Sequence, residues 1–195
     1  INDLEFEISL DSFFQTNPKS AEKLYDLAID YVRESIAGSS LLNNEEPLIL
    51  DLFCGTGTIG QIIKSQIPKA KIIGVEIIPE AIEDAKENAK RNNIEGIEFF
   101  ADDVGKFLKV HPEYQGTIDT IVLDPPRAGI APKTLKKVIE LQSKSIIYVS
   151  CNPATMARDT STLIESGYKL QKISLVDQFP HTSHVECVGV YQLKD

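Results

Sequence analysis

Short apolar runs alternate with amphipathic stretches along most of this 195-residue chain. The runs are rich in Ile, Val, Leu and Phe, and most of the stretches between them have helical spacing. This alternation predicts an α/β fold with a doubly wound, mostly parallel sheet. The expected strands are Leu48–Phe53, Lys71–Val75, Ile97–Phe100, Ile118–Leu123, Ser145–Val149, Leu170–Val176 and Cys187–Leu193. The expected helices are Ile59–Gln66, Pro79–Asn92, Pro132–Gln142 and Ala154–Ser166.

The last two expected strands are joined by a connection, Asp177 to Glu186, that is too short for a crossover helix. They are therefore predicted to pair as an antiparallel hairpin. Seven strands that end in such a hairpin resemble the Rossmann-like class I fold of S-adenosylmethionine-dependent methyltransferases. We expect one domain, with a core over residues 47–195. Residues 1–46 are expected to form an extension with a strand at Phe6–Leu10 and a helix at Lys19–Ser35.

Composition narrows the class of protein. The chain is 42% hydrophobic and 25% charged, and it has neither an apolar run of about 18 residues nor a basic-then-apolar leader. Three widely spaced cysteines argue against a disulfide framework and favour a reducing compartment, so a cytoplasmic location is expected. Because the first residue is Ile1, a piece of a longer protein is also expected. A net charge of −9 means that any nucleic acid would need local basic groups or another segment.

A glycine-rich turn follows the first expected strand. Gly55, Gly57 and Gly60 match the pattern G-x-G-x-x-G, in which glycines let the backbone approach a ligand closely. Asp51 precedes the turn, and a carboxylate there would repel a pyrophosphate but suit the cationic centres of S-adenosylmethionine. The pattern therefore favours this methyl donor over a nicotinamide dinucleotide. Phe53 stands where many methyltransferases have another glycine, and it is expected to line the cofactor.

Acidic residues also end the next two expected strands. Glu76 ends the second strand, where a carboxylate can accept hydrogen bonds from both ribose hydroxyls. Asp102 and Asp103 follow the third strand, and we prefer Asp103 as the acceptor for an adenine amino group. One such acid alone would be read as a solvated loop carboxylate. Acids at three successive strand ends instead favour a nucleoside site.

The turn after the fourth expected strand reads Asp124-Pro125-Pro126-Arg127. Enzymes that methylate amino groups of adenine or cytosine have a similar turn followed by an aromatic residue that stacks on the base. Arg127 replaces that aromatic residue, so this class loses its base platform. Asp124 could contact the donor or hydrogen-bond the edge of a flipped base, and a rigid turn with a helix cap is the structural alternative.

Cys151 follows the fifth expected strand at the same edge of the sheet. A cysteine often serves only as a small buried hydrophobe, and this interpretation is kept for Cys54 and Cys187. For Cys151 the strand-end position would expose the sulfur to the cleft that the other motifs define. We therefore interpret Cys151 as a nucleophile.

Methylation at carbon 5 of uracil needs one cysteine and one base. A thiolate that adds to carbon 6 makes carbon 5 nucleophilic, and a base must then remove the carbon 5 proton before the thiol can leave. Glu186, at the start of the last strand, is our choice for the base. His181 and His184 are alternatives, because an unperturbed imidazole titrates nearer neutrality. No second ligand pair with zinc spacing accompanies them, so no metal site is expected.

Taken together, these motifs resemble the RNA uracil-5-methyltransferase family, which makes 5-methyluridine in tRNA and ribosomal RNA. The resemblance covers essentially the whole chain and is carried by Phe13–Pro18, Asp51–Gly57, Asp124–Arg127, Ser150–Pro153 and His184–Glu186. It implies S-adenosylmethionine as cofactor, and it implies an RNA-binding region N-terminal to this piece. Thr58 stands where many bacterial members have Asn. The implied donor-site residues are Gln15, Phe53, Thr58, Glu76, Asp103 and Asp124, with Cys151 as nucleophile and Glu186 as base.

The predicted function is S-adenosylmethionine-dependent methylation of carbon 5 of a uridine in RNA, through a covalent bond between Cys151 and carbon 6. The predicted partner is RNA, with tRNA favoured over ribosomal RNA, and no membrane is expected. RNA cytosine-5 methyltransferases are the nearest enzymatic alternative, but they carry a second cysteine where this chain has Pro126 and Arg127. A donor-binding, non-catalytic RNA-associated subunit is the alternative from another class. The presence of both Cys151 and Glu186 argues against it.

Overall fold

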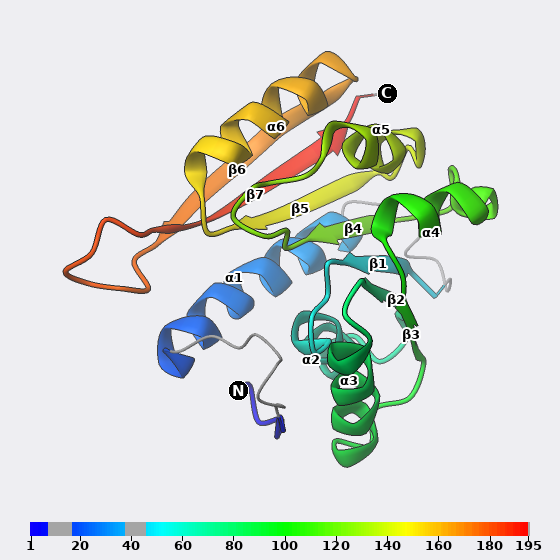
Figure 1. Cartoon of the computed structure of the whole chain (residues 1–195), viewed down its shortest axis with the longest axis vertical. Helices are drawn as coiled ribbons and strands as arrows, with labels where there is room; N and C mark the ends of the chain where they lie inside the picture. Colours follow the sequence, from blue (N-terminus) through cyan, green and yellow to red (C-terminus); the bar gives the residue numbers. More distant parts are fainter. Residues whose placement is uncertain (8–16, 38–45, 195) are drawn as a thin grey trace.

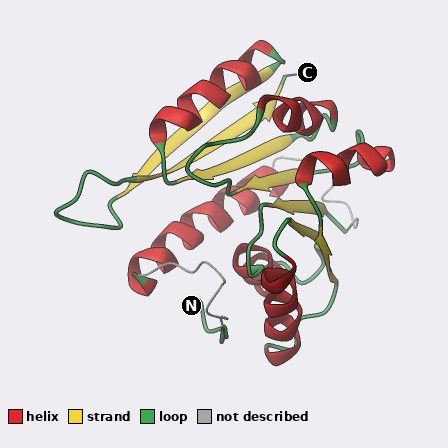
Figure 2. Ribbon diagram, in the orientation of Figure 1, coloured by secondary structure: helices red, strands yellow, loops and turns green. Residues whose placement is uncertain are grey.

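The computed structural model describes residues 1–7, 17–37 and 46–194, which form a seven-stranded sheet with helices packed against it (Figure 1; Figure 2). The strands are β1 (Leu48–Leu52), β2 (Lys71–Glu76), β3 (Ile97–Ala101), β4 (Thr120–Leu123), β5 (Ser145–Ser150), β6 (Tyr168–Val176) and β7 (Glu186–Leu193). The helices are α1 (Pro18–Ala37), α2 (Thr58–Gln66), α3 (Pro79–Arg91), α4 (Val104–Val110), α5 (Pro132–Glu140) and α6 (Pro153–Glu165), with a short 3-10 helix at Pro112–Tyr114.

The strand order is β3-β2-β1-β4-β5-β7-β6. The first five strands in this order are parallel, and β7 pairs antiparallel with both β5 and β6. The predicted parallel sheet with a C-terminal antiparallel hairpin is thus confirmed, and it is the class I methyltransferase architecture. The chain order reverses between β1 and β4, and open sheets of this kind bind ligands beside the carboxyl ends of the strands at such a point.

Two apolar layers cover the sheet, one on each face. Helices α1 and α2 contribute to one layer, and α4, α5 and α6 contribute to the other. Alternate residues of a strand face opposite layers: within β5, Tyr148 belongs to the second layer and Val149 to the first. Because both faces are covered, the parallel strands in the middle of the sheet are apolar along almost their whole length.

The helix expected at Lys19–Ser35 is observed as α1. Leu24, Ala28 and Val32 recur at helical spacing and are fully buried, because α1 packs across β5, β7 and β6. The strand expected at Phe6–Leu10 falls largely on residues 8–16, which lie outside the described residues, and residues 1–7 contain no strand. In the described part of the chain no helix is both long and apolar enough to span a membrane.

The hairpin of β6 and β7 extends past the rest of the sheet, and its connecting loop projects from the molecule (Figure 1). Helix α1 holds the base of this hairpin. The Tyr31 hydroxyl lies 2.6 Å from the Ser174 hydroxyl, and the Asn17 side chain donates to the carbonyl of Gln178 at 2.9 Å. These contacts fix the hairpin, and with it the start of β7, against the body of the domain.

Candidate active site

The glycine turn after β1 is shaped by three residues in the left-handed backbone region. Phe53, Gly55 and Gly57 have φ angles of 63°, 53° and 71°. This region favours glycine, so a phenylalanine at position 53 is held there by its surroundings. A Cβ on Gly57 would lie 2.7 Å from the Phe99 ring, which means that the turn packs closely on β3. The turn leads directly into α2, and its backbone N–H groups are the kind that approach a ligand.

Asp51 lies fully buried beneath this turn. Its Oδ2 accepts a hydrogen bond from the backbone N–H of Gly60 at 2.9 Å, which ties β1 to the first turn of α2. Its Oδ1 is buried and has no hydrogen-bond partner among the residues that the structure describes. Burial raises the pKa of Asp51 to about 7, the Gly60 hydrogen bond opposes that rise, and the charge of Glu76 adds to it. An unpartnered buried carboxylate oxygen is costly unless a ligand or water meets it.

Glu76 lies at the end of β2, half-buried beside the turn. One carboxylate oxygen accepts from the backbone N–H of Gly55 at 3.2 Å, and the other accepts from Ile77 and Ile78 at 2.8 and 3.1 Å. Glu76 therefore holds the glycine turn against β2. The side chains of Ile77 and Ile78 are 57% and 44% exposed, and they place an apolar surface at this edge that the strand pattern did not predict. That Glu76 accepts from a ribose stays a prediction.

The other predicted donor-site residues are distributed around the same edge. Asp103 follows β3 and caps α4, since its carboxylate accepts from the backbone N–H of Lys106 at 2.9 Å. Thr58 is buried at the start of α2, with its hydroxyl 3.1 Å from that of Thr56. Gln15 lies outside the described residues. That these residues contact the methyl donor stays a prediction.

Cys151, Asp124 and Glu186 meet at the neighbouring strand ends. Ser150, the last residue of β5, pairs with Cys187 of β7, so the next pair along this antiparallel register is Cys151 with Glu186. Asp124 directly follows β4, whose last residue Leu123 pairs with Tyr148 of β5. Glu186 is 5% exposed, whereas Cys151 and Asp124 are half-buried. The sheet therefore brings together the thiol and the two carboxylates that the sequence placed at separate strand ends.

Burial and mutual repulsion shift the titration of this group. Burial raises the pKa of Asp124 to about 8, and the charges of Glu186, Asp51 and Glu76 add to the rise. Burial also raises the pKa of Glu186, and the positive charge of Arg127 opposes it. The pKa of the Cys151 thiol is raised by burial and by the charges of Glu186 and Asp124, and a hydrogen bond and charge from Arg127 lower it. The site is thus an acidic cluster in which Arg127 is the group that favours a thiolate.

Arg127 is fixed through its backbone and its side chain. Its carbonyl accepts from the Asn152 side chain at 3.0 Å and from the Thr155 hydroxyl at 3.3 Å, and Asn152 directly follows Cys151. Its guanidinium donates to Nδ1 of His184, 2.9 Å away on the β6–β7 loop. Asn152 also caps α6 by accepting from the N–H of Ala154 at 3.1 Å. The sequence identified Arg127 only as the residue that replaces an aromatic platform, so this network was not predicted.

A second buried carboxylate supports the turn that carries Arg127. Asp159 of α6 is 2% exposed and accepts from the Tyr148 hydroxyl at 2.8 Å and from the Ile130 N–H at 2.9 Å. Arg158 pairs with the same carboxylate and donates to the carbonyls of Ala128 and Ile130 at 3.2 Å. The sequence signal was an Arg-Asp pair inside an otherwise amphipathic helix, which reads as an ordinary surface pair.

The two remaining cysteines are buried or half-buried, and the two histidines of the hairpin loop are exposed. Cys187 is 1% exposed within the apolar core, as expected for a small hydrophobe, and burial raises the pKa of both Cys187 and Cys54. His181 and His184 are both exposed on the projecting loop. Within the described ranges, no three His, Cys, Asp or Glu side chains form a group that could hold a metal ion.

Curated proteins similar to this chain in sequence are described as RNA methyltransferases. A protein described as an uncharacterized RNA methyltransferase from Clostridium tetani is 46% identical over 98% of this chain. The tRNA (uracil-54, C5)-methyltransferase of Pyrococcus abyssi, solved with S-adenosyl-L-homocysteine, is 32% identical and superposes over 97% of this chain and 42% of its own, with a TM-score of 0.74. The chain spans about 40% of the length of the curated relatives it matches.

A more distant likeness bears on the fold alone. The precorrin-6y C5,15-methyltransferase of Geobacter metallireducens has a TM-score of 0.72 over 98% of this chain and 96% of its own, at 13% sequence identity. The family model for tRNA (uracil-5-)-methyltransferase, by contrast, matches residues 2–194, which is nearly every residue of this chain. The chain therefore belongs to the tRNA (uracil-5-)-methyltransferase family.

Proposed function

We propose that this chain is the catalytic part of an enzyme that uses S-adenosylmethionine to methylate carbon 5 of a uridine in RNA. The observation that carries the proposal is the β5–β7 register, which continues from Ser150 and Cys187 to Cys151 and Glu186, at the edge of the sheet where the glycine turn also follows β1. Family membership supports the same reaction class. A tRNA substrate is proposed from the family description and from the Pyrococcus abyssi relative, which acts on a tRNA uracil.

The acidic cluster suits a cationic nucleoside ligand. Asp51 keeps a buried carboxylate oxygen without a hydrogen-bond partner among the described residues. The charge of Glu76 raises the pKa of Asp51, and the charges of both raise the pKa of Asp124. A positively charged ligand would relieve that repulsion, whereas a pyrophosphate would add to it. The residues proposed to hold the donor are Gln15, Asp51, Phe53, Gly55, Gly57, Thr58, Glu76, Asp103 and Asp124.

The residues of the chain then perform the covalent steps. The bound donor supplies an electrophilic methyl group. The Cys151 thiolate adds to carbon 6 of uracil, and the electron pair of the 5,6 double bond moves to form an enolate. Carbon 5 of that enolate would take up the methyl group as the methyl–sulfur bond of the bound donor breaks and leaves a neutral thioether. Glu186 removes the carbon 5 proton, the 5,6 double bond re-forms, and the carbon–sulfur bond breaks to release the Cys151 thiolate.

Arg127 and Asp124 have supporting parts in this proposal. Arg127 stabilises the thiolate of Cys151, because its guanidinium is the group that lowers the pKa of that thiol. With a pKa of about 8, Asp124 carries a proton at neutral pH and can both donate and accept along the edge of a base. A flipped uridine, rather than a base in a duplex, is the substrate that could reach these groups.

The test is methyl transfer from labelled S-adenosylmethionine to unmodified tRNA and ribosomal RNA, followed by nucleoside identification, with the natural full-length chain. Label in 5-methyluridine of tRNA is expected. Cys151→Ala should bind the donor and transfer no methyl, and retained turnover would remove Cys151 from the mechanism. Glu186→Gln should accumulate a protein–RNA adduct, whereas rapid release would favour a histidine base. Label in 5-methylcytidine would support the cytosine alternative, and donor binding without transfer to any RNA would support the non-catalytic one.

A further inference from the structure

Four exposed lysines lie on the neighbouring helices α4 and α5. Lys106 and Lys109 are three residues apart on α4, and Lys133 and Lys136 have the same spacing on α5. All four are exposed, because each helix turns its apolar residues toward the sheet. None of the four forms an ion pair with any residue of the described ranges. We call these four residues the α4–α5 lysine surface.

The two helices pack against each other beside the active site (Figure 1). A Cβ on Gly105 would lie 3.0 Å from the Thr134 hydroxyl, so the first turns of α4 and α5 are in close contact. Lys106 follows Gly105 and Lys133 precedes Thr134, which places both lysines next to that contact. Helix α4 starts after Asp103 and α5 starts shortly after the Arg127 turn, so the α4–α5 lysine surface begins at the edge of the sheet that carries the acidic cluster.

This surface has a charge opposite to that of the rest of the chain. Helices α4 and α5 contain five lysines and one glutamate in 16 residues, a net charge of +4. Since the whole chain carries −9, the other 179 residues carry −13. The fifth lysine, Lys137, is neutralised by Glu140 at 2.5 Å. Four unpaired positive charges in an acidic protein therefore collect on one helix pair.

We propose that the α4–α5 lysine surface binds phosphate groups of the RNA strand that flanks the target uridine. The inference rests on the proposed function in taking RNA as the partner. Lysines on exposed helix faces contact phosphates as mobile point charges, and such contacts supply affinity and orientation rather than sequence readout. The surface would hold the RNA next to an acidic cluster that itself repels phosphate, because α4 starts directly after Asp103 and α5 starts shortly after the Arg127 turn.

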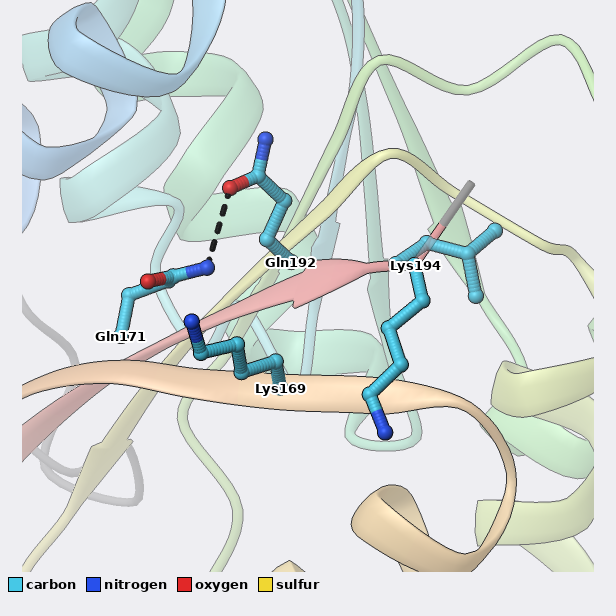
Figure 3. A pocket seen from close by; sticks show the side chains of 5 residues that line it. Lys169, Gln171, Gln192 and Lys194 are labelled. Carbon is cyan, nitrogen blue, oxygen red and sulfur yellow. Dashed lines mark hydrogen bonds between the residues drawn. The ribbon is translucent and has the colours of Figure 1, made fainter.

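Another lysine group in the molecule provides a matched control. Lys169 and Lys194 line a shallow polar pocket on the β6–β7 hairpin, with Gln171 donating to Gln192 at 3.2 Å (Figure 3). The start of β6 pairs with the end of β7, and the end of β7 pairs with the start of β5, so this pocket lies at the sheet edge opposite to Cys151. Exposed Lys69, before β2, and Lys90, at the end of α3, lie toward that same opposite edge.

The experiment compares two quadruple variants of the natural full-length chain that lose the same charge. One is Lys106→Gln, Lys109→Gln, Lys133→Gln and Lys136→Gln, and the control is the same substitution at positions 69, 90, 169 and 194. Affinity for an unmodified tRNA transcript is measured between 50 and 300 mM salt. The first variant should bind about tenfold more weakly or worse near 0.1 M salt, with a salt slope lower by about 3, because each phosphate contact contributes about 0.7 to 0.9 to that slope.

The control should lose less than about twofold in affinity and keep its salt slope, because it changes charge far from the proposed path. Equal loss in both variants, or no loss in the first, would overturn the inference, as would failure of the unsubstituted protein to bind tRNA. Binding of an acidic protein in place of RNA would also overturn it. The paired variants Lys106→Gln/Lys133→Gln and Lys109→Gln/Lys136→Gln should each give part of the effect, which guards against a folding defect in the quadruple variant.

Methyl transfer is a separate readout. If the unsubstituted protein binds tRNA and methylates no uridine, the proposed function fails while the binding comparison still decides the role of the lysines. If it methylates uridine and both quadruple variants bind alike, the α4–α5 lysine surface fails while the proposed function stands. Affinity for S-adenosyl-L-homocysteine should be the same in all variants, since none of these lysines is proposed to hold the donor.

Discussion

Replacing Asp51 by asparagine should stabilise the protein at neutral and alkaline pH while weakening donor binding. Asp51 is fully buried, and only one of its oxygens has a hydrogen-bond partner among the described residues, the N–H of Gly60. An asparagine of the same shape keeps that acceptor and removes the buried charge. The stability gained comes from the charge that the wild type must otherwise bury.

The sign and size of this change in stability follow from the pKa of the Asp51 carboxyl. Its usual value is 3.8, and burial raises the folded-state pKa to about 7. Between these values the folded protein holds a proton that the unfolded chain releases, so the free energy of unfolding falls as pH rises. The stability that the bound proton of Asp51 contributes is fully present below about pH 4 and fully lost above about pH 7. At 1.36 kcal/mol per unit, the upper bound on the loss is about 4 kcal/mol, and relaxation around the charge should reduce it to about 2.

Urea unfolding of the wild type and of Asp51→Asn at pH 4.5, 6 and 8 gives the measurement. The difference in unfolding free energy should grow in favour of the variant across this range, by about 2 kcal/mol. Asp30→Asn removes a carboxylate from the exposed face of α1 and should leave the pH dependence of the wild type as it is. A difference between Asp51→Asn and the wild type that stays constant with pH would refute the assignment of a buried, proton-binding carboxyl beneath the glycine turn.

Three further predictions address the supporting structure. Arg127→Met should shift the alkylation of Cys151 by iodoacetamide to higher pH, because the guanidinium lowers the pKa of that thiol; an unchanged profile would contradict its role. Asp159→Ala should lower the free energy of unfolding by about 3 kcal/mol or more in urea, since it leaves a buried hydroxyl and N–H unpaired, and a loss below 1 kcal/mol would refute this. Gly57→Ala should destabilise by about 2–4 kcal/mol but Gly55→Ala by only about 1–2, because only a Cβ at 57 meets the Phe99 ring; equal losses would exclude that contact.

Most of the sheet could be predicted from the sequence because its strands are buried on both faces and therefore read as unbroken apolar runs. The short connection between the last two strands was enough to predict their antiparallel pairing. Helix α4 was missed, since it has only seven residues and three buried apolar side chains, Val104, Phe107 and Leu108, inside a lysine-bearing segment. Its N-cap, Asp103, was noticed for its carboxylate and assigned to a ligand, although a cap was an equally direct meaning of that residue.

The placement of the candidate site residues could be predicted where the proposed chemistry requires a given residue type at a strand end. It could not be predicted where tertiary packing determines which side chains meet. Cys151 and Glu186 stand at strand ends, so knowledge of the topology alone brings them to one edge of the sheet. The contact between Arg127 and His184 joins residues 57 positions apart through a projecting loop, and no local pattern encodes it. Similarly, the burial of Asp51 and Asp159 depends on the elements that pack around them in the fold, and the sequence alone gives the carboxylate without its surroundings.

The antiparallel pairing of β5 with β7 limits which insertions and deletions the candidate site could tolerate during evolution. Backbone hydrogen bonds between β5 and β7 set the separation of Cys151 and Glu186. This separation therefore does not depend on the length of the loop between β6 and β7. Insertions or deletions in the loop would leave the reacting pair in place, whereas a one-residue slip between the strands would turn Glu186 to the other face of the sheet. The strand pairing therefore keeps Cys151 and Glu186 side by side, whereas a change in the loop would alter the contact between Arg127 and His184.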